Sequence, residues 1–208
     1  MIRWLSALLL IVPLGAIAAL PQPEAGALYA DADPAAMAMQ PGPGRNAQFR
    51  SELNRRIRAN PRNAVALIQR AFALHASGDM VEGDRDFERV LALTEAKPDQ
   101  RRRAYWSLGW SALNRAEPQQ AIMHWQRAAE LHGGRPFWYA YTMAVGSWAA
   151  GDRETALAWY TAAVLSRQEW GTASGMAERT RHWRKPEQAA MKAIFEAWSA
   201  DAATAPAG

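Results

Sequence analysis

The sequence predicts an all-α protein whose helices pair and stack into an α-solenoid. Three observations lead to this prediction. Apolar residues recur at helical spacing over residues 46–199, similar stretches return at intervals of 38 and 35 residues, and turn-forming residues separate them. Because one helix pair cannot bury its apolar face alone, about three such units must stack to form a core.

The repeat is clearest in the second helix of each expected unit. Residues 79–91 and 152–164 align without a gap, and residues 116–129 form a third copy between them. Each copy carries an aromatic residue at the corresponding position: Phe87, Trp125 and Tyr160. Another helical stretch precedes each of them, at residues 64–76, 102–115 and 137–149. Small residues beside the aromatic positions allow two helices to approach closely.

Local signals mark where these helices begin. Asp79 and Asp152 each follow a glycine and are good N-caps, and Glu82 completes a capping box with Asp79. Pro118 is expected in the first turn of its helix, where a missing N–H costs nothing.

These residues resemble the tetratricopeptide repeat family, in which a unit of about 34 residues folds as a helix pair. The matches in phase include Leu108-Gly109, Gly78-Asp79 and Gly151-Asp152, while Arg70 and Met143 depart from the leucine that the family prefers. The resemblance implies repeats at about 64–97, 102–135 and 137–170, preceded by a half-repeat at 46–59. Two further helices, at 171–183 and 187–199, are expected to cap the stack, and residues 200–208 to fray.

The N-terminus has the layout of a secretory signal peptide over residues 1–18. Arg3 supplies a positive start, an uncharged apolar stretch follows, and Ala16-Ile17-Ala18 matches the small-x-small cleavage pattern. An uncleaved inner-membrane anchor is the alternative, and with Arg3 on the cytoplasmic side it too places the domain in the periplasm. We therefore expect a periplasmic or secreted protein.

Residues 19–45 are expected to form a flexible linker. Alanine, proline and glycine dominate this stretch, and few large apolar groups are present to offset its ordering entropy. A brief helix over residues 27–39 is the one local structure that the pattern suggests.

Composition and motifs argue against an enzyme, a metal site or a cofactor. The chain has 208 residues, a formal charge of +4 and no cysteine, which excludes disulfides, thiolate metal sites and cysteine nucleophiles. No phosphate-binding loop or His-Glu-x-x-His motif occurs, and the four histidines are scattered. We therefore predict no cofactor, no metal ion and no catalytic residue. An enzyme whose catalytic residues cannot be identified from motifs is kept as an alternative function.

A basic stretch from Arg45 to Arg62 holds six arginines against one acidic residue, Glu52. In an exported protein nucleic acid is not the expected partner. We expect either a solvated face or a peripheral contact with anionic membrane lipids or an acidic partner.

The ten tryptophans are the most unusual feature of the composition, and they lead to the functional hypothesis. In the family that the chain resembles, the first helix of each unit lines a concave groove. Carried over to this sequence, the resemblance implies an aromatic groove whose binding residues are Phe72, His75, Arg103, Trp106, Trp110, Trp138, Tyr141 and Trp148.

Rigid aromatic side chains on a groove wall suit the docking of a protein or peptide segment. The predicted function is therefore that of a non-enzymatic scaffold or adaptor for a partner in the cell envelope. Binding of a cell-wall glycan or glycopeptide on the same surface is the first alternative. A second is that the linker or the C-terminal helices fill the groove themselves.

Overall fold

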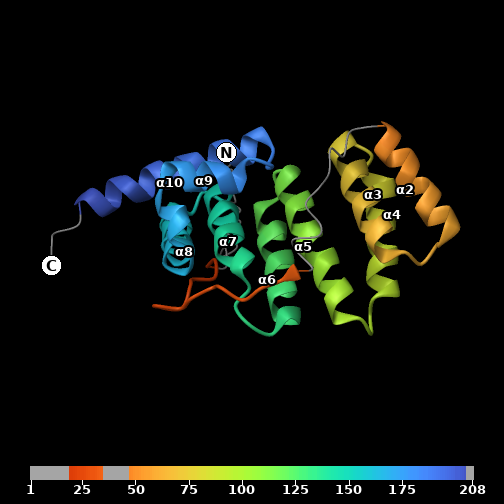
Figure 1. The fold of residues 1–208 in the computed structure, drawn as a ribbon, viewed down its shortest axis with the longest axis horizontal. Coiled ribbons are helices and arrows are strands. Elements are labelled where there is room, and N and C mark those ends of the chain that lie inside the picture. The colour runs from red at the N-terminus through yellow and green to blue at the C-terminus, as the bar shows by residue number, and fades with distance from the viewer. Residues whose placement is uncertain (1–18, 35–46, 205–208) are drawn as a thin grey trace, which may run out of the picture.

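The computed structural model describes residues 19–34 and 47–204, and over these residues the protein is all-α (Figure 1). Within these residues the only β-type contact is a single parallel bridge between Asp31 and Pro136. The expected signal peptide at 1–18, the later part of the linker and the last four residues lie outside the described residues. None of the helices described here has both the length and the apolarity that crossing a membrane requires.

Three helix pairs correspond to the three expected units and confirm the α-solenoid. Each pair packs against the next, and a preceding helix packs against the first pair. The elements are α2 (Ala47–Ala59), then α3 (Ala64–Ser77) with α4 (Met80–Leu93), α5 (Pro98–Asn114) with α6 (Pro118–His132), and α7 (Phe137–Ala149) with α8 (Arg153–Ser166). The helix α5 starts at Pro98 rather than at 102, because proline fits the first helical turn.

The helix starts follow the capping chemistry of the sequence. The Asp79 carboxylate accepts a hydrogen bond from the Glu82 backbone N–H at 3.4 Å, and the Asp152 carboxylate accepts one from the Thr155 N–H at 3.0 Å. Gly78 and Gly151 precede these caps in the left-handed conformation, with φ of 92° and 84°. Only glycine adopts this geometry without strain, which explains both Gly-Asp pairs.

Trp125 is the central packing residue of the stack. Its side chain is 0% exposed, and its Nε1 donates to the Trp106 carbonyl at 3.2 Å. A Cβ atom on Gly109 would lie 2.2 Å from Trp125 Nε1, and one on Gly146 would lie 3.0 Å from Cζ3 of the same ring. The two glycines therefore make room for the indole between α5 and α7.

The C-terminal segment covers one end of the stack. It consists of a 3₁₀ turn (Gln168–Gly171), a short helix α9 (Ala173–Thr180) and a long helix α10 (Lys185–Thr204) that packs on α7 and α8. The first of the two predicted helices, 171–183, is shorter than expected because Thr172 caps it, accepting from the Gly175 N–H. Trp183 lies in the turn between α9 and α10.

Residues 19–34 form an extended segment, which we call the strap, that runs along the edge of the stack past α8, α7 and α6 (Figure 1). This corrects the prediction of a flexible linker for the described part of residues 19–45, and residues 27–33 are not helical either. Ala27, Tyr29 and Asp33 are buried against the helices. The stretch has few large apolar residues, but two buried side chains, Tyr29 and Asp33, are enough to hold it against the helices.

Candidate functional site

The eight predicted groove residues lie on the first helices of the three pairs, α3, α5 and α7, as expected. They differ in how accessible they are. His75, Trp106 and Trp138 are buried, whereas the other five are partly exposed: Phe72, Arg103, Trp110, Tyr141 and Trp148.

Trp138 lies under the strap. Its side chain is 0% exposed, and its Nε1 donates to the Asp33 carboxylate at 3.0 Å. The chain itself therefore covers this predicted binding residue, which is the outcome expected if the linker fills part of the groove.

The C-terminal segment covers two more of the predicted residues. The Trp183 ring lies 4.9 Å from Trp110 and 5.5 Å from Tyr141, measured between ring centroids, and Trp170 lies 5.3 Å from Tyr141. Burial raises the pKa of the Tyr141 phenol above its ordinary value. Trp183 thus joins the aromatic rings of α5 to those of α7.

Trp148 is separate from this aromatic cluster. It lies near the C-terminal end of α7, and the Arg153 guanidinium at the start of α8 is 5.3 Å from the centre of its ring. This cation–π contact accounts for its position without a ligand.

His75 does not line a shared wall, and here the prediction needs correction. Its ring packs against Phe87 at 5.4 Å, in space left free by Gly83, where a Cβ atom would lie 2.1 Å from the His75 ring. Its Nδ1 is 2.5 Å from Ser111 Oγ and 2.9 Å from an Arg115 nitrogen. The side chain therefore links the first helix pair to α5.

Ser111, His75 and Asp84 have the residue types of a catalytic triad, which the scattered sequence positions did not suggest. A serine nucleophile must reach its substrate, but Ser111 is 1% exposed. Moreover, His75 Nε2 lies 3.1 Å from Asp84 Oδ1 without the alignment of a hydrogen bond. The geometry is that of a buried polar link between helix pairs.

This link predicts a loss of stability in mild acid. Burial, and secondarily the charge of Arg115, lower the pKa of His75, so folding favours the neutral ring. The stabilisation is complete above the ordinary histidine pKa of about 6.5 and falls below it, because the unfolded chain then binds a proton that the folded protein does not. Urea unfolding between pH 7.5 and 5 measures the effect.

The test variant is His75→Gln, and the control is His182→Gln, because His182 is exposed. We expect the pH dependence to weaken only in His75→Gln. His124, whose pKa burial also lowers, is unchanged in both variants and supplies a common background. An unaltered slope in His75→Gln would refute the assignment.

One face of α5 carries buried polar atoms without partners. Its side chains are spaced at helical intervals of three and four residues, and we call them the α5 stripe: Arg103, Trp106, Trp110 and Asn114. Within residues 19–34 and 47–201, no hydrogen-bond partner is present for Arg103 Nε, for either indole Nε1 or for Asn114 Oδ1.

Three other buried indoles of the described residues have acceptors. Trp125, Trp138 and Trp159 donate to the Trp106 carbonyl, to Asp33 and to the Pro21 carbonyl at 3.2, 3.0 and 2.7 Å. A buried donor without an acceptor is costly, so the two unpaired indoles of the stripe need an explanation. The sequence identified both tryptophans and Arg103 but missed Asn114, which helical spacing from Trp110 would have added.

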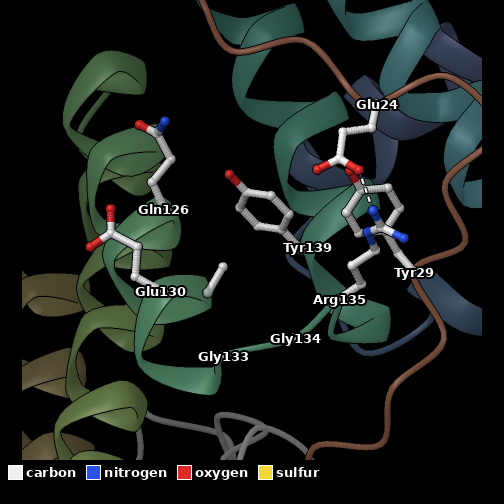
Figure 2. Close-up of a pocket in the computed structure, with 9 residues that line it drawn as sticks. Glu24, Tyr29, Gln126, Glu130, Gly133, Gly134, Arg135 and Tyr139 are labelled. Carbon is white, nitrogen blue, oxygen red and sulfur yellow. Dashed lines mark hydrogen bonds and ion pairs between the residues drawn. The ribbon is translucent and has the colours of Figure 1, made fainter.

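A separate cleft of about 320 Å³ lies between α6, the start of α7 and the strap (Figure 2). The Tyr139 side chain projects into it, facing Gln126 and Glu130, while an ion pair between Glu24 and Arg135 closes the opposite side (Figure 2). Burial raises the pKa of Tyr139. The sequence did not indicate this cleft because the strap forms one of its walls.

The basic helix α2 lies at the opposite end of the stack from α10 (Figure 1). Arg55 and Arg56 pair with Glu52, whereas Arg58 is exposed. Contact of these arginines with an anionic membrane stays a prediction. Among the described residues no three histidine, aspartate or glutamate side chains come together in a way that could hold a metal ion.

Comparison with protein-family models, with curated proteins and with solved structures gives no match for this chain in any of the three.

Proposed function

We propose that this protein is a non-enzymatic scaffold or adaptor of the tetratricopeptide type that acts in the bacterial periplasm. In this proposal the α5 stripe binds an extended segment of a protein partner. The exported location rests on the signal-peptide-like residues 1–18, and the solenoid supplies the rigid support.

The unpaired indole nitrogens of Trp106 and Trp110 carry the proposal. Both are donors, and a peptide offers carbonyl acceptors along its whole length. Both nitrogens are buried in the free protein, so a ligand must displace the side chains over them, including Trp183, whose ring lies 4.9 Å from that of Trp110. Arg103 adds attraction for a carboxylate.

The spacing of the stripe fits an extended chain. Helical residues four apart are separated by about 6 Å along the axis, since an α-helix rises about 1.5 Å per residue. Carbonyl groups on the same side of an extended chain recur every two residues, at about 6.6 Å. Trp106 and Trp110 are four residues apart, so two successive carbonyls on one side of the segment can accept from their indoles. Asn114 lies four residues further on, where its unpaired Oδ1 can accept from a backbone N–H of the same segment.

The first experiment identifies the bound segment. A photo-crosslinking amino acid replaces Arg103 in the stripe, and a control protein carries it at the exposed Arg127 on α6. The segment crosslinked in intact envelopes only from position 103 is then synthesised as a peptide. Its affinity for the purified protein is measured by titration.

The prediction concerns the double variant Trp106→Phe and Trp110→Phe, which keeps an aromatic ring at both positions and removes both donors. Peptide affinity is expected to fall about tenfold or more, since each lost hydrogen bond contributes about 1 kcal/mol. Trp198→Phe is the control, because its Nε1 already donates to Thr161. Circular dichroism checks that helicity is unchanged.

Two outcomes contradict the proposal. One is a peptide affinity that the double variant leaves unaltered. The other is that muramidase-digested wall fragments bind the stripe and the crosslinked peptide does not, in which case the glycan alternative is correct.

A further inference from the structure

The strap is bound to the solenoid in the way that a peptide ligand would be. Asp31 forms a short parallel bridge with the α6–α7 loop: its N–H donates to the Arg135 carbonyl at 3.1 Å, and its carbonyl accepts from the Phe137 N–H at 3.0 Å. The Asp31 carboxylate also accepts from the Arg135 N–H at 2.6 Å. Backbone pairing of this kind holds an extended segment whatever its sequence.

Tyr29 is the aromatic anchor of the strap. Its ring lies 5.3 Å from Trp159 and 6.0 Å from Tyr139, between centroids, and the side chain is buried. Its backbone N–H donates to Ser166 Oγ at 2.7 Å. The pocket between α7 and α8 therefore selects a large aromatic side chain.

Asp33 is the acidic anchor, four residues further on. Its carboxylate is 1% exposed and receives two hydrogen bonds of 3.0 Å from Arg102 and one from the Trp138 indole. A forked arginine contact of this kind is specific for a carboxylate. Any segment that occupies the same surface must present an acid at this point.

Charge complementarity supports this reading. Residues 19–34 contain three acidic residues, Glu24, Asp31 and Asp33, and no lysine or arginine. The surface beneath contributes Arg102 and Arg135, which pair with Asp33 and Glu24. The surface under the strap therefore suits an acidic extended segment.

The strap is held by few buried side chains. Only Ala27, Tyr29 and Asp33 are buried among its residues, so its local opening is expected to be far easier than unfolding of the helices. Arg102 keeps a carboxylate after release, because Asp99 already accepts from its Nη1 at 2.9 Å. The exposed rings of Trp138, Tyr139 and Trp159 then require another cover.

We propose that the surface under the strap, formed by the N-terminal ends of α5 and α7 together with α8, is a second peptide-docking site. The strap is its tethered occupant. An acidic, extended segment of a partner protein, with an aromatic residue and a carboxylate four positions later, replaces it. This inference does not depend on the α5 stripe.

Hydrogen exchange in the unaltered protein is the first test. The amide protons of Tyr29, Asp31 and Phe137 are bonded across the strap, so they are expected to exchange at least a hundredfold faster than buried amides of α5 and α7. Exchange as slow as that of the helix interiors would mean that the strap never opens, and it would overturn the proposal.

The second test uses a labelled synthetic peptide with the sequence of residues 19–34. The host is the full protein carrying Tyr29→Ala and Asp33→Ala, which removes both anchors of its own strap. This double variant is expected to bind the peptide with at least tenfold higher affinity than the unaltered protein, because in the unaltered protein the tethered strap competes for the site. The matched host variant Leu28→Ala, at a residue that is 56% exposed, is expected to behave like the unaltered protein.

Specificity completes this test. A peptide in which the aspartate is moved by one position, or replaced by asparagine, is expected to lose most of its affinity for the weakened host. If hydrogen exchange shows the strap released but the original peptide does not bind, the site has no affinity for a separate segment and the proposal fails. Concentration-dependent dimers of the unaltered protein, abolished by Asp33→Ala, would instead assign the site to a second copy of the chain.

Discussion

Replacement of Trp125 by alanine is expected to lower the free energy of unfolding by about 4 kcal/mol. The indole is fully buried, it fills the space that Gly109 and Gly146 leave open, and it donates to the Trp106 carbonyl. Alanine removes this packing and leaves a cavity between α5 and α7 that rigid helices fill only in part. Urea unfolding followed by circular dichroism measures the change.

Trp198→Ala is the matched control, because this ring is half-buried on α10 and contacts Tyr160 near the end of the stack. We expect it to cost less than half as much as Trp125→Ala. Trp125 also lies beneath the stripe, with its ring 5.3 Å from Trp110, so its loss is expected to disturb the stripe as well. Equal costs for the two variants would show that Trp125 is not the central packing residue.

Replacement of Arg102 by alanine is expected to cost about 3 kcal/mol, the usual consequence of removing one partner of a buried ion pair. Asp33 then keeps only the Trp138 indole among its hydrogen bonds described above. Asp33→Ala is expected to cost less, because Arg102 retains Asp99. Urea unfolding gives the cost of each variant, and hydrogen exchange shows whether the strap opens.

The double variant Arg102→Ala, Asp33→Ala completes the cycle. It is expected to be more stable than Arg102→Ala alone, because the buried carboxylate that loses the forked Arg102 contact is removed as well. If Asp33→Ala were the more damaging single change, the ion pair would not hold the strap as described.

The repeat could be predicted from sequence because its signals are local and occur several times. The aromatic residue of each second helix, the small residues beside it and the Gly-Asp caps recur in phase, and the structure places a helix pair at each unit. Boundaries were less certain where one residue decides them. Pro98 starts α5 earlier than expected, and Thr172 starts α9 later.

The candidate site could be predicted only in part, since burial depends on contacts distant in sequence. Helical spacing placed Trp106 and Trp110 on one face of α5. It could not show that Gly83 leaves room for the His75 ring between the first helix pair and α5, or that Trp183, more than 70 residues from Trp110, covers the Trp110 ring.

The strap was missed for a different reason. Its composition is that of a linker, and its order comes from a few specific contacts rather than from a broad apolar face. Asp33 is 69 residues from Arg102, and a sequence pattern does not reveal a pair at that separation.

The hydrogen-bonding state of the indole groups tests the central claim most directly. A ¹H–¹⁵N spectrum of the free protein, assigned through single Trp→Phe variants, resolves each indole proton by its chemical shift and temperature coefficient. We expect Trp106 and Trp110 to show the values of unbonded indoles, whereas Trp125, Trp138 and Trp159 show those of bonded donors. Bonded values for both stripe indoles in the free protein would mean that their acceptors are already present, and the α5 stripe would have no unmet donor for a partner to satisfy.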